Sequence, residues 1–489
     1  MSVFERLPRN YSMVTDAYEV FMANAIFGIE LENYEGVFDV FFRPINNIGY
    51  GVMAGLDKVI EYIKSLHFTE EDIEYFKNTN YGFDDEFLNY LRNFKFTGDI
   101  YAVPDGTPVF PNEPLITVKA PIMEVMIIET ALLAIINGAV WHATAARRMV
   151  EATPKDVPIM EFGARRADGF ESAIDTSLYS IMVGCKGTSN VMAAQILGLR
   201  ALGTMAHSFI ELFNLEFEAF KRFATKYPNN ATLLVDTYDT LKSGVPNAIR
   251  TFDYMKEQGL PLDNIGIRID SGDLAYLTKQ ARKMLDEAGY PNAKICISNS
   301  LTAEKIESLI REGAYFNSLG IGEHMSNPNG NLGAVYKLMA VIINEKISPR
   351  IKLSNDVIKT TNPDYKDLYR AFDKDTGMAL ADIICSRGKK LDEGRIEIVS
   401  LTDSTKSDYL ENYNLVKLQK TIFKDGECVY EYPGILENIA YCEEQMQTIP
   451  REVKRTVDPY QYYVDGTREY AKLKNEMILS HRRSVNERY

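Results

Sequence analysis

The feature that most constrains this sequence is a stretch after Pro158 in which short apolar runs alternate with helix-like segments. Each run ends in polar or glycine residues, and the clearest helical segment, 273–288, has one apolar face and stops at Gly289. Strands and helices that alternate at this spacing indicate parallel βαβ units. A series of this length favours a (β/α) barrel over an open sheet. The apolar runs are 159–162, 201–203, 232–235, 265–269, 294–297 and 319–321.

The residues before this series show a different pattern. Helix-like segments at 16–26 and 54–66 flank a strand-like run at 37–42. From 98 to 120 the sequence is β-like and is divided by prolines and Asp-Gly, which indicates tight turns between short strands. A long helix is predicted at 122–151. We therefore expect an amino-terminal α/β region with a β-rich insert.

The carboxy-terminal part returns to β-like runs from about Val341 and ends in a charged helix at 467–482. The predicted fold class is therefore α/β, with an irregular barrel flanked by α/β and β-rich regions. The expected domains are 1–150, an amino-terminal region; 151–340, the barrel that carries the active site; and 341–489, a β-rich region ending in helices.

Charge excludes some classes of partner. The 68 acidic and 54 basic residues give a net charge of −14, which argues against nucleic acid or an anionic membrane as the main partner. The most apolar stretch, 122–141, is interrupted by Glu124, Glu129 and Asn137, so we interpret it as a buried helix and not as a membrane span.

Cysteine usage indicates a reducing compartment. The five cysteines are scattered and form no Cys-x-x-Cys pair, which favours neither a disulfide scaffold nor a zinc ribbon. The first residues lack the basic-then-apolar layout of a secretion signal. We expect a cytoplasmic protein.

Candidate site residues follow the apolar runs, because chemistry in a (β/α) barrel collects at the carboxyl ends of the strands. Arginines, acids and glycine turns in this position suit a substrate that bears phosphates, a carboxylate and hydroxyls. The candidates are Arg165, Arg166, Thr204, His207, Asp236, Asp239, Asp270, Ser271, Asp273, Ser298, Asn299, Gly320 and Gly322.

Several of these residues also have a structural interpretation. His207 has apolar neighbours, so its local sequence taken alone favours a hydrogen-bonded core histidine. Asp236 and Asp239 could cap the segment that follows them, and Asp273 could cap the helix that begins beside it. For Asp270, at the junction of strand and helix, a functional role is favoured.

The arginines and glycines also have structural alternatives. A surface pair with Asp168 would explain Arg165 and Arg166, but we expect one of the two to be functional. Gly320 and Gly322 could serve only a tight turn, yet barrels often bind phosphate at the loops after their last two strands.

Six motifs, in their order and spacing, resemble those of the nicotinate phosphoribosyltransferase family along almost the whole chain. The segment around His207 is the most diagnostic of them. The motifs are Thr15–Tyr18, Glu161–Ala167, Gly203–Ser208, Leu234–Thr240, Ile267–Asp273 and Gly333–Lys337.

The resemblance implies a type II phosphoribosyltransferase barrel in a homodimer with shared active sites. It implies nicotinate, phosphoribosyl pyrophosphate and ATP as substrates, with Mg²⁺ as cofactor. His207 would take the γ-phosphoryl group of ATP, as a phosphohistidine. Tyr18, contributed by the neighbouring subunit, would stack on the pyridine ring of nicotinate. Arg165 would face the nicotinate carboxylate, and Thr204 would lie beside the ring.

The remaining implied roles concern the sugar, its phosphate and the metal. Asp270 is expected to act with the ribose hydroxyls and Mg²⁺, and Asp273 is a second expected metal ligand. The implied ribose and phosphate contacts are Ser271, Gly272, Asn299, Gly320, Gly322 and Gly333.

Two positions depart from the family pattern. Glu323 follows Gly322 where a threonine is usual, and an acid beside a phosphate loop is unfavourable unless it turns away or binds magnesium. Ser300 stands where an acid or amide is common. These departures bear on the phosphate contacts and leave the assignment of His207 unchanged.

Three alternatives remain open at this level. A nicotinamide-using relative would favour an acid near the ring, whereas Thr204-Met205 supplies none and Arg165 suits a carboxylate. A non-catalytic relative that binds phosphoribosyl metabolites is suggested only by Glu323. A phosphosugar lyase or isomerase could use the same barrel, but no clear Schiff-base lysine ends a strand.

Overall fold

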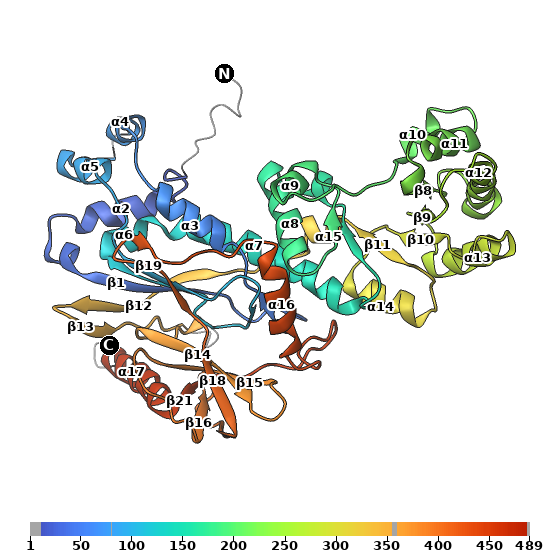
Figure 1. Ribbon diagram of the computed structural model, residues 1–489. Helices are drawn as coiled ribbons and strands as arrows, with labels where there is room; N and C mark the ends of the chain where they lie inside the picture. Colours follow the sequence, from blue (N-terminus) through green and yellow to red (C-terminus); the bar gives the residue numbers. More distant parts are fainter. Residues whose placement is uncertain (1–10, 80, 355–358, 487–489) are drawn as a thin grey trace. The chain divides into compact units, whose positions relative to one another are not determined.

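The computed structural model describes residues 11–79, 81–354 and 359–486, which form two compact units (Figure 1). The terminal unit comprises the chain up to Trp141, Asn331–Gly434 and the chain from Ala440 onward. The barrel unit comprises His142–Gly330 and Ile435–Ile439. Among the described residues, no helix is both long and apolar enough to cross a membrane.

The terminal unit contains a seven-stranded sheet that draws on both ends of the chain. Its order is β13-β12-β1-β5-β3-β19-β20, so strands before and after the barrel pair with one another. The structure thus groups the chain differently from the three regions expected from the sequence. The strands are β1 (Glu35–Phe41), β3 (Asp99–Ala102), β5 (Ile116–Pro121), β12 (Val335–Ile343), β13 (Lys346–Pro349), β19 (Lys420–Lys424) and β20 (Glu427–Cys428).

A second sheet in the same unit, of order β17-β16-β21-β15-β14-β18, is built from carboxy-terminal residues alone. The charged terminal helix predicted from the sequence is present as α17 (Arg468–Asn486). The strands are β14 (Lys366–Asp373), β15 (Ala379–Ser386), β16 (Arg395–Ser400), β17 (Ser407–Glu411), β18 (Tyr413–Lys417) and β21 (Val464–Thr467).

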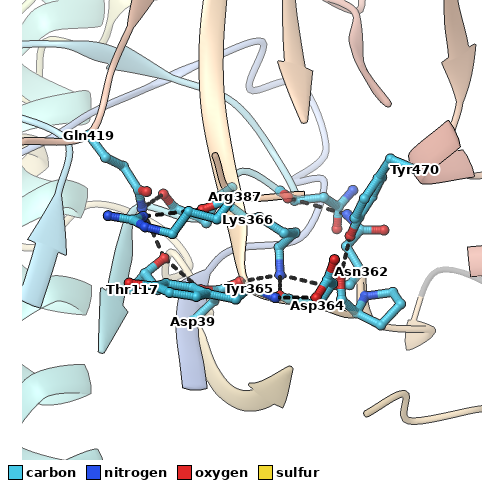
Figure 2. A network of polar contacts seen from close by, with 12 residues as sticks. Asp39, Thr117, Asn362, Asp364, Tyr365, Lys366, Arg387, Gln419 and Tyr470 are labelled. Atoms are coloured by element: carbon cyan, nitrogen blue, oxygen red, sulfur yellow. Dashed lines mark hydrogen bonds and ion pairs between the residues drawn. The ribbon is translucent and has the colours of Figure 1, made fainter. Parts of the chain in front are cut away.

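A buried polar network joins these two sheets (Figure 2). The ammonium group of Lys366, on β14, lies 2.6 Å from Oδ2 of Asp39, on β1, and both side chains are almost fully buried. The Thr117 hydroxyl donates to the same aspartate over 2.7 Å. From α17, the Tyr470 hydroxyl donates to the Pro363 carbonyl. Because a buried charge is costly without its partner, the network fixes the sheets against each other.

The helices predicted at 16–26 and 54–66 are present as α2 (Ala17–Ile26) and α3 (Leu56–Ser65), and α4 (Glu70–Asn78) follows them. The long helix expected at 122–151 is interrupted at Ile128. It forms as α6 (Ile122–Ile127) and α7 (Glu129–Ala152). A further helix, α5 (Asp85–Arg92), completes this group.

The barrel unit has a six-stranded parallel sheet of order β7-β6-β11-β10-β9-β8. The strands β7 and β8, consecutive in the chain, stand at opposite ends of this order. The sheet is therefore an incomplete barrel with one seam, which confirms the predicted irregular barrel. Its strands are β6 (Ile159–Glu161), β7 (Gly187–Thr188), β8 (Ala231–Leu234), β9 (Ile265–Ile269), β10 (Lys294–Ile297) and β11 (Ser318–Ile321).

One predicted strand, 201–203, is wrong. This segment has no ladder of its own; a single backbone bond joins the Leu202 N–H to the Thr188 carbonyl of β7 over 2.8 Å. On its other side, the Asn230 amide, just before β8, donates to the Gly203 carbonyl over 3.2 Å. The segment lies across the seam, where it links β7 to the start of β8 without strand geometry.

The helix predicted at 273–288 is present as α13 (Leu274–Glu287), with Asp273 at its start. Thr302 caps α14 (Ala303–Arg311) by accepting the Lys305 N–H over 3.2 Å, as threonine commonly does at a helix start. The other helices of this unit are α8 (Phe170–Met182), α9 (Val191–Ile196), α10 (His207–Glu211), α11 (Glu216–Lys226), α12 (Val245–Glu257) and α15 (Glu323–Ser326).

Candidate active site

The carboxyl ends of β8, β9 and β10 bring Asp236, Asp270 and Ser298 together. Each residue follows an apolar strand whose neighbours are parallel, so the strand ends meet at one edge of the sheet. The Ser298 hydroxyl donates to Oδ1 of Asp270 over 2.5 Å, and the Asp270 N–H donates to Oδ2 of Asp236 over 2.9 Å. The carboxylate of Asp270 is therefore held in a defined orientation.

His207 is the first residue of α10 and faces the same cluster. Its Nδ1 lies 3.1 Å from the Thr237 hydroxyl, and its Nε2 lies 3.8 Å from Oδ2 of Asp270. The imidazole is 39% exposed. A core histidine is excluded by this exposure, and the ring is accessible to a ligand at the barrel mouth.

Asp236 and Asp239, which could both have been helix caps, have different partners in the structure. Asp236 also accepts the Ser271 hydroxyl over 2.5 Å, and its Oδ1 is buried with no hydrogen-bond partner among the described residues. In contrast, Asp239 accepts the Leu241 and Lys242 N–H groups and caps the turn that follows. Asp236 belongs to the cluster, whereas the Asp239 carboxylate is used as a cap.

Asp273, an expected metal ligand, has the same capping geometry. Its Oδ1 accepts the Tyr276 N–H over 3.0 Å at the start of α13. In the described part of the chain, no group of three or more His, Cys, Asp or Glu side chains is arranged to hold a metal ion. A metal at this site would therefore need oxygen ligands from a substrate as well.

Arg165 and Arg166 lie in a short turn, η2 (Ala164–Arg166), after β6. Both are exposed. In residues 11–79, 81–354 and 359–486, neither guanidinium forms a hydrogen bond or ion pair, and the surface pair with Asp168 is absent. Two unpaired cations at the barrel mouth suit an anionic ligand.

Gly320, within β11, and Gly322, directly after it, make room for the turn after β6. A Cβ on Gly320 would lie 2.6 Å from the ring of Phe162, and one on Gly322 would lie 3.0 Å from the Phe162 carbonyl oxygen. Glycine is required at 320 by the close approach of this ring. The Glu323 side chain, at the start of α15, is exposed to solvent.

Arg268 is a site residue that the sequence candidates omitted. Its guanidinium donates to the Thr204 hydroxyl over 2.8 Å and to the Met205 carbonyl over 3.1 Å, and its Nε is buried without a partner in the described part of the chain. A signal for it existed, because Arg268 is a cation inside an apolar strand. It lies two positions from Asp270, hence on the same face.

A cavity of about 190 Å³ lies inside the barrel. Phe162 and Thr204 line it near the carboxyl ends of the strands, and Lys294 and Ser318, the first residues of β10 and β11, line its other end. Its lining is mixed, with Met160 and Ile267 beside the polar Arg200 and Asn230, so it could hold a small ligand that has both apolar and polar parts. Phe162, like Arg268, was not among the sequence candidates.

The loop after β10 contains two residues in left-handed backbone conformation, Asn299 at φ 99° and Ser300 at φ 46°. The ammonium group of Lys305 donates to the Asn299 carbonyl over 2.8 Å. Asparagine and aspartate tolerate this conformation better than serine does. The geometry therefore explains why an acid or amide suits position 300.

Two further expected site residues, Tyr18 and Gly333, belong to the terminal unit. The Tyr18 side chain is 45% exposed and its hydroxyl is hydrogen-bonded to Glu129; burial and the nearby carboxylates raise its pKa to about 12. Gly333 has a φ of 63°, which favours glycine.

Family models match both ends of the chain. The model for the nicotinate phosphoribosyltransferase (NAPRTase) N-terminal domain matches residues 13–137, and the model for the C-terminal domain of the same enzyme matches residues 365–474.

Relatives and solved structures extend the match across the barrel. Nicotinate phosphoribosyltransferase of Bacillus subtilis is 36% identical over 459 residues, 93% of this chain and 92% of that protein. The crystal structure of human nicotinic acid phosphoribosyltransferase superposes with a TM-score of 0.82 at 25% identity, covering 95% and 99% of the two chains. Nicotinate-nucleotide pyrophosphorylase from Pyrococcus furiosus, at 22% identity and a TM-score of 0.66, shares the fold over 89% of this chain and 95% of that one. The chain therefore belongs to the nicotinate phosphoribosyltransferase family.

Proposed function

We propose that this protein transfers the phosphoribosyl group of phosphoribosyl pyrophosphate to nicotinate, for NAD salvage, and couples the transfer to ATP hydrolysis. The products are nicotinate mononucleotide and pyrophosphate. The observation that carries the proposal is the pairing of His207 with the oriented carboxylate of Asp270 at the barrel mouth, in a chain of this family. The unpaired Arg165 and Arg166 supply positive charge for the anionic substrates.

In the transfer step, the ring nitrogen of nicotinate forms a bond to C1 of the ribose while the bond from C1 to the pyrophosphate oxygen breaks. Positive charge develops on the ribose ring, and a carboxylate held close to it stabilises that charge. Asp270 is suited to this role because Ser298 donates to its carboxylate and Asp236 accepts its backbone N–H. The nitrogen attacks with its own lone pair, so the step needs orientation and no proton transfer.

Recognition of nicotinate is assigned to Arg165, which would pair with the carboxylate, and to Thr204 beside the ring. The hydrogen bond from Arg268 fixes the Thr204 hydroxyl. Phe162 lines the same cavity as Thr204. A neutral nicotinamide would leave a carboxylate-binding cation without its charge partner, so the acid is the preferred substrate.

The residues at the strand ends also fit a magnesium ion. Asp270 offers a carboxylate, and the unpartnered buried Oδ1 of Asp236 offers a second hard oxygen. Mg²⁺ is typically held by one or two carboxylates together with substrate phosphates. When bound, it would neutralise charge on the departing pyrophosphate.

ATP enters the scheme through His207. If Nδ1–H donates to the Thr237 hydroxyl, Nε2 carries the lone pair that attacks the γ-phosphorus, and ADP leaves. Water then cleaves the phosphohistidine to phosphate and restores the imidazole. A phosphorylated state with higher substrate affinity couples this hydrolysis to binding.

We also assign the protein to the cytoplasm as a homodimer with shared active sites. Exposed apolar side chains gather around Tyr18 in the terminal unit and on α9 in the barrel unit, and contiguous exposed apolar surface marks interfaces. They include Val14, Phe21, Met22, Val191, Met192 and Ile196. The five cysteines, which all lie in the described residues, form no disulfide, as in a reducing compartment.

The decisive test is mononucleotide formation from nicotinate and from nicotinamide in parallel, with and without ATP and Mg²⁺. We expect product from nicotinate, more of it at limiting substrate when ATP is present, and little from nicotinamide. Preference for nicotinamide would show that the protein is a nicotinamide phosphoribosyltransferase instead. Absence of product from both, with phosphoribosyl pyrophosphate still bound, would assign a non-catalytic binding protein.

A further inference from the structure

One buried hydroxyl, that of Ser326 in α15, joins the two loops to which nicotinate and phosphate binding are assigned. Its side chain is 1% exposed. The hydroxyl donates to the Gly163 carbonyl over 2.7 Å, at the start of the turn that carries Arg165, and its second acceptor is the Gly322 carbonyl at 3.2 Å. Ser326 thus contacts the backbone after the first strand of the barrel and the backbone after the last.

The two loops are packed too closely to move independently. A Cβ on Gly163 would lie 2.0 Å from the Ser326 hydroxyl oxygen and 2.7 Å from the Gly322 carbonyl oxygen. The Phe162 N–H also donates to the Ile321 carbonyl over 2.7 Å. A shift of either loop must therefore be shared by the other or break these bonds.

Both sides of this contact are anchored. The Gly163 N–H donates to the carboxylate of Glu161, which is fully buried and also accepts the hydroxyls of Ser177 and Thr188 over 2.8 and 2.6 Å. On the other side, Nδ1 of His142 lies 2.9 Å from the Met325 carbonyl, next to Ser326. The hydroxyl is therefore the link between two rigid elements.

We propose that Ser326 is a positioning residue that couples the two substrates. Phosphoribosyl pyrophosphate at the Gly322 loop would fix α15 and, through Ser326, the Gly163 turn, so that Arg165 is oriented before nicotinate arrives. Nicotinate then binds more tightly to the protein that already holds its co-substrate, and the reverse holds equally. This inference rests on the proposed function, and Ser326 itself touches no substrate.

The test compares the KM for nicotinate at low and at saturating phosphoribosyl pyrophosphate. In the unmodified protein the KM should fall as the co-substrate rises. In Ser326→Ala the ratio of the two KM values should move toward one by about fivefold, as for the loss of one buried hydrogen bond, while kcat changes less. Ser180→Ala is the matched control, because this buried hydroxyl contacts the same helix only through the Met325 sulfur at 3.8 Å.

Each outcome is decisive. An unchanged KM ratio in a folded Ser326→Ala protein, checked by its thermal unfolding, overturns the coupling. Should that variant not fold, Ser326→Cys retains the volume with a weaker donor, and a wild-type ratio in it has the same meaning. A nicotinate KM that is independent of the co-substrate in the unmodified protein also overturns it. Failure of the unmodified protein to form mononucleotide would instead reject the proposed function.

Discussion

Nε2 of His207, the first residue of α10, lies 3.8 Å from Oδ2 of Asp270, which follows β9, although the two residues are far apart in the chain. In the proposed scheme, one is the point at which ATP acts and the other is the group that faces the reacting sugar. Their proximity means that a charge placed on the imidazole is felt directly at the carboxylate, because two charges about 4 Å apart interact by roughly 4 kcal/mol at an effective dielectric constant near 20. This contact offers a direct route from phosphorylation to substrate binding.

His207→Asn should abolish phosphorylation while leaving slow transfer. After brief exposure to γ-labelled ATP and Mg²⁺, the unmodified protein should carry acid-labile label and the variant none. Mononucleotide formation without ATP should persist in both. His481→Asn, on the exposed surface of α17, is the matched control and should be labelled normally. Label that remains in His207→Asn would reject the phosphohistidine.

Arg165→Ala should weaken nicotinate far more than phosphoribosyl pyrophosphate. Losing a hydrogen-bonded ion pair costs about 1.5–3 kcal/mol, so the KM for nicotinate should rise roughly 10- to 100-fold. Arg166→Ala, on the adjacent exposed arginine, is the natural comparison and should have a smaller effect. Equal losses for both substrates would show that the carboxylate is bound elsewhere, with Arg268 as the next candidate.

Asp270→Asn and Asp273→Ala should separate catalysis from helix capping. The first removes the charge that faces the sugar, and kcat should fall roughly 100- to 1000-fold, as for other preorganised electrostatic groups. The second removes a cap of α13, so the free energy of unfolding should fall by about 1 kcal/mol with activity retained. Reduced Mg²⁺ affinity in Asp273→Ala, measured by activity titration, would make Asp273 a metal ligand after all.

Ser300→Asn should stabilise the protein. Ser300 has a φ of 46°, a conformation that costs most residues about 1–2 kcal/mol and that asparagine adopts more readily. The midpoint of chemical denaturation should rise without a change in its slope. The control, Ser308→Asn, places the same residue within α14 and should give no gain. A lower midpoint for Ser300→Asn would mean that the serine side chain makes a compensating contact.

Lys474 should make the free energy of unfolding rise with pH in the alkaline range. Burial and the nearby Lys366 lower its pKa from the ordinary 10.5 to about 8, while its ammonium donates to Oδ1 of Asn362 over 2.7 Å. Between these two values the unfolded chain binds more protons than the folded one, so the contribution of this group to stability rises with pH from about 8 to 10.5. Lys474→Met should reduce that rise. Denaturation curves for both proteins, measured at intervals of pH, provide the check.

Much of the barrel could be predicted from local patterns. The strands β6, β8, β9, β10 and β11 and the cap of α14 follow from apolar runs and capping residues, which depend only on neighbours in the chain. The sequence did not predict β7, which borders the seam. This strand is only Gly187–Thr188, too short to show any periodicity. The segment at 201–203 is apolar enough to suggest a strand but forms only one backbone hydrogen bond to β7 and no strand pairing.

For the candidate site, too, only some of the features could be predicted from the sequence. The sequence by itself determined that Asp270 and Arg165 follow strands of one barrel, because a strand end fixes where the next side chain lies. His207 was found from its motif, since the strand predicted before it does not form. Only the tertiary structure decided which candidates act as caps, and that Arg268 holds the hydroxyl of Thr204, which lines a cavity together with Phe162. It also decided that Ser326 joins two loops far apart in the chain. Such contacts depend on how closely distant segments of the chain pack against each other. No local sequence pattern records that packing.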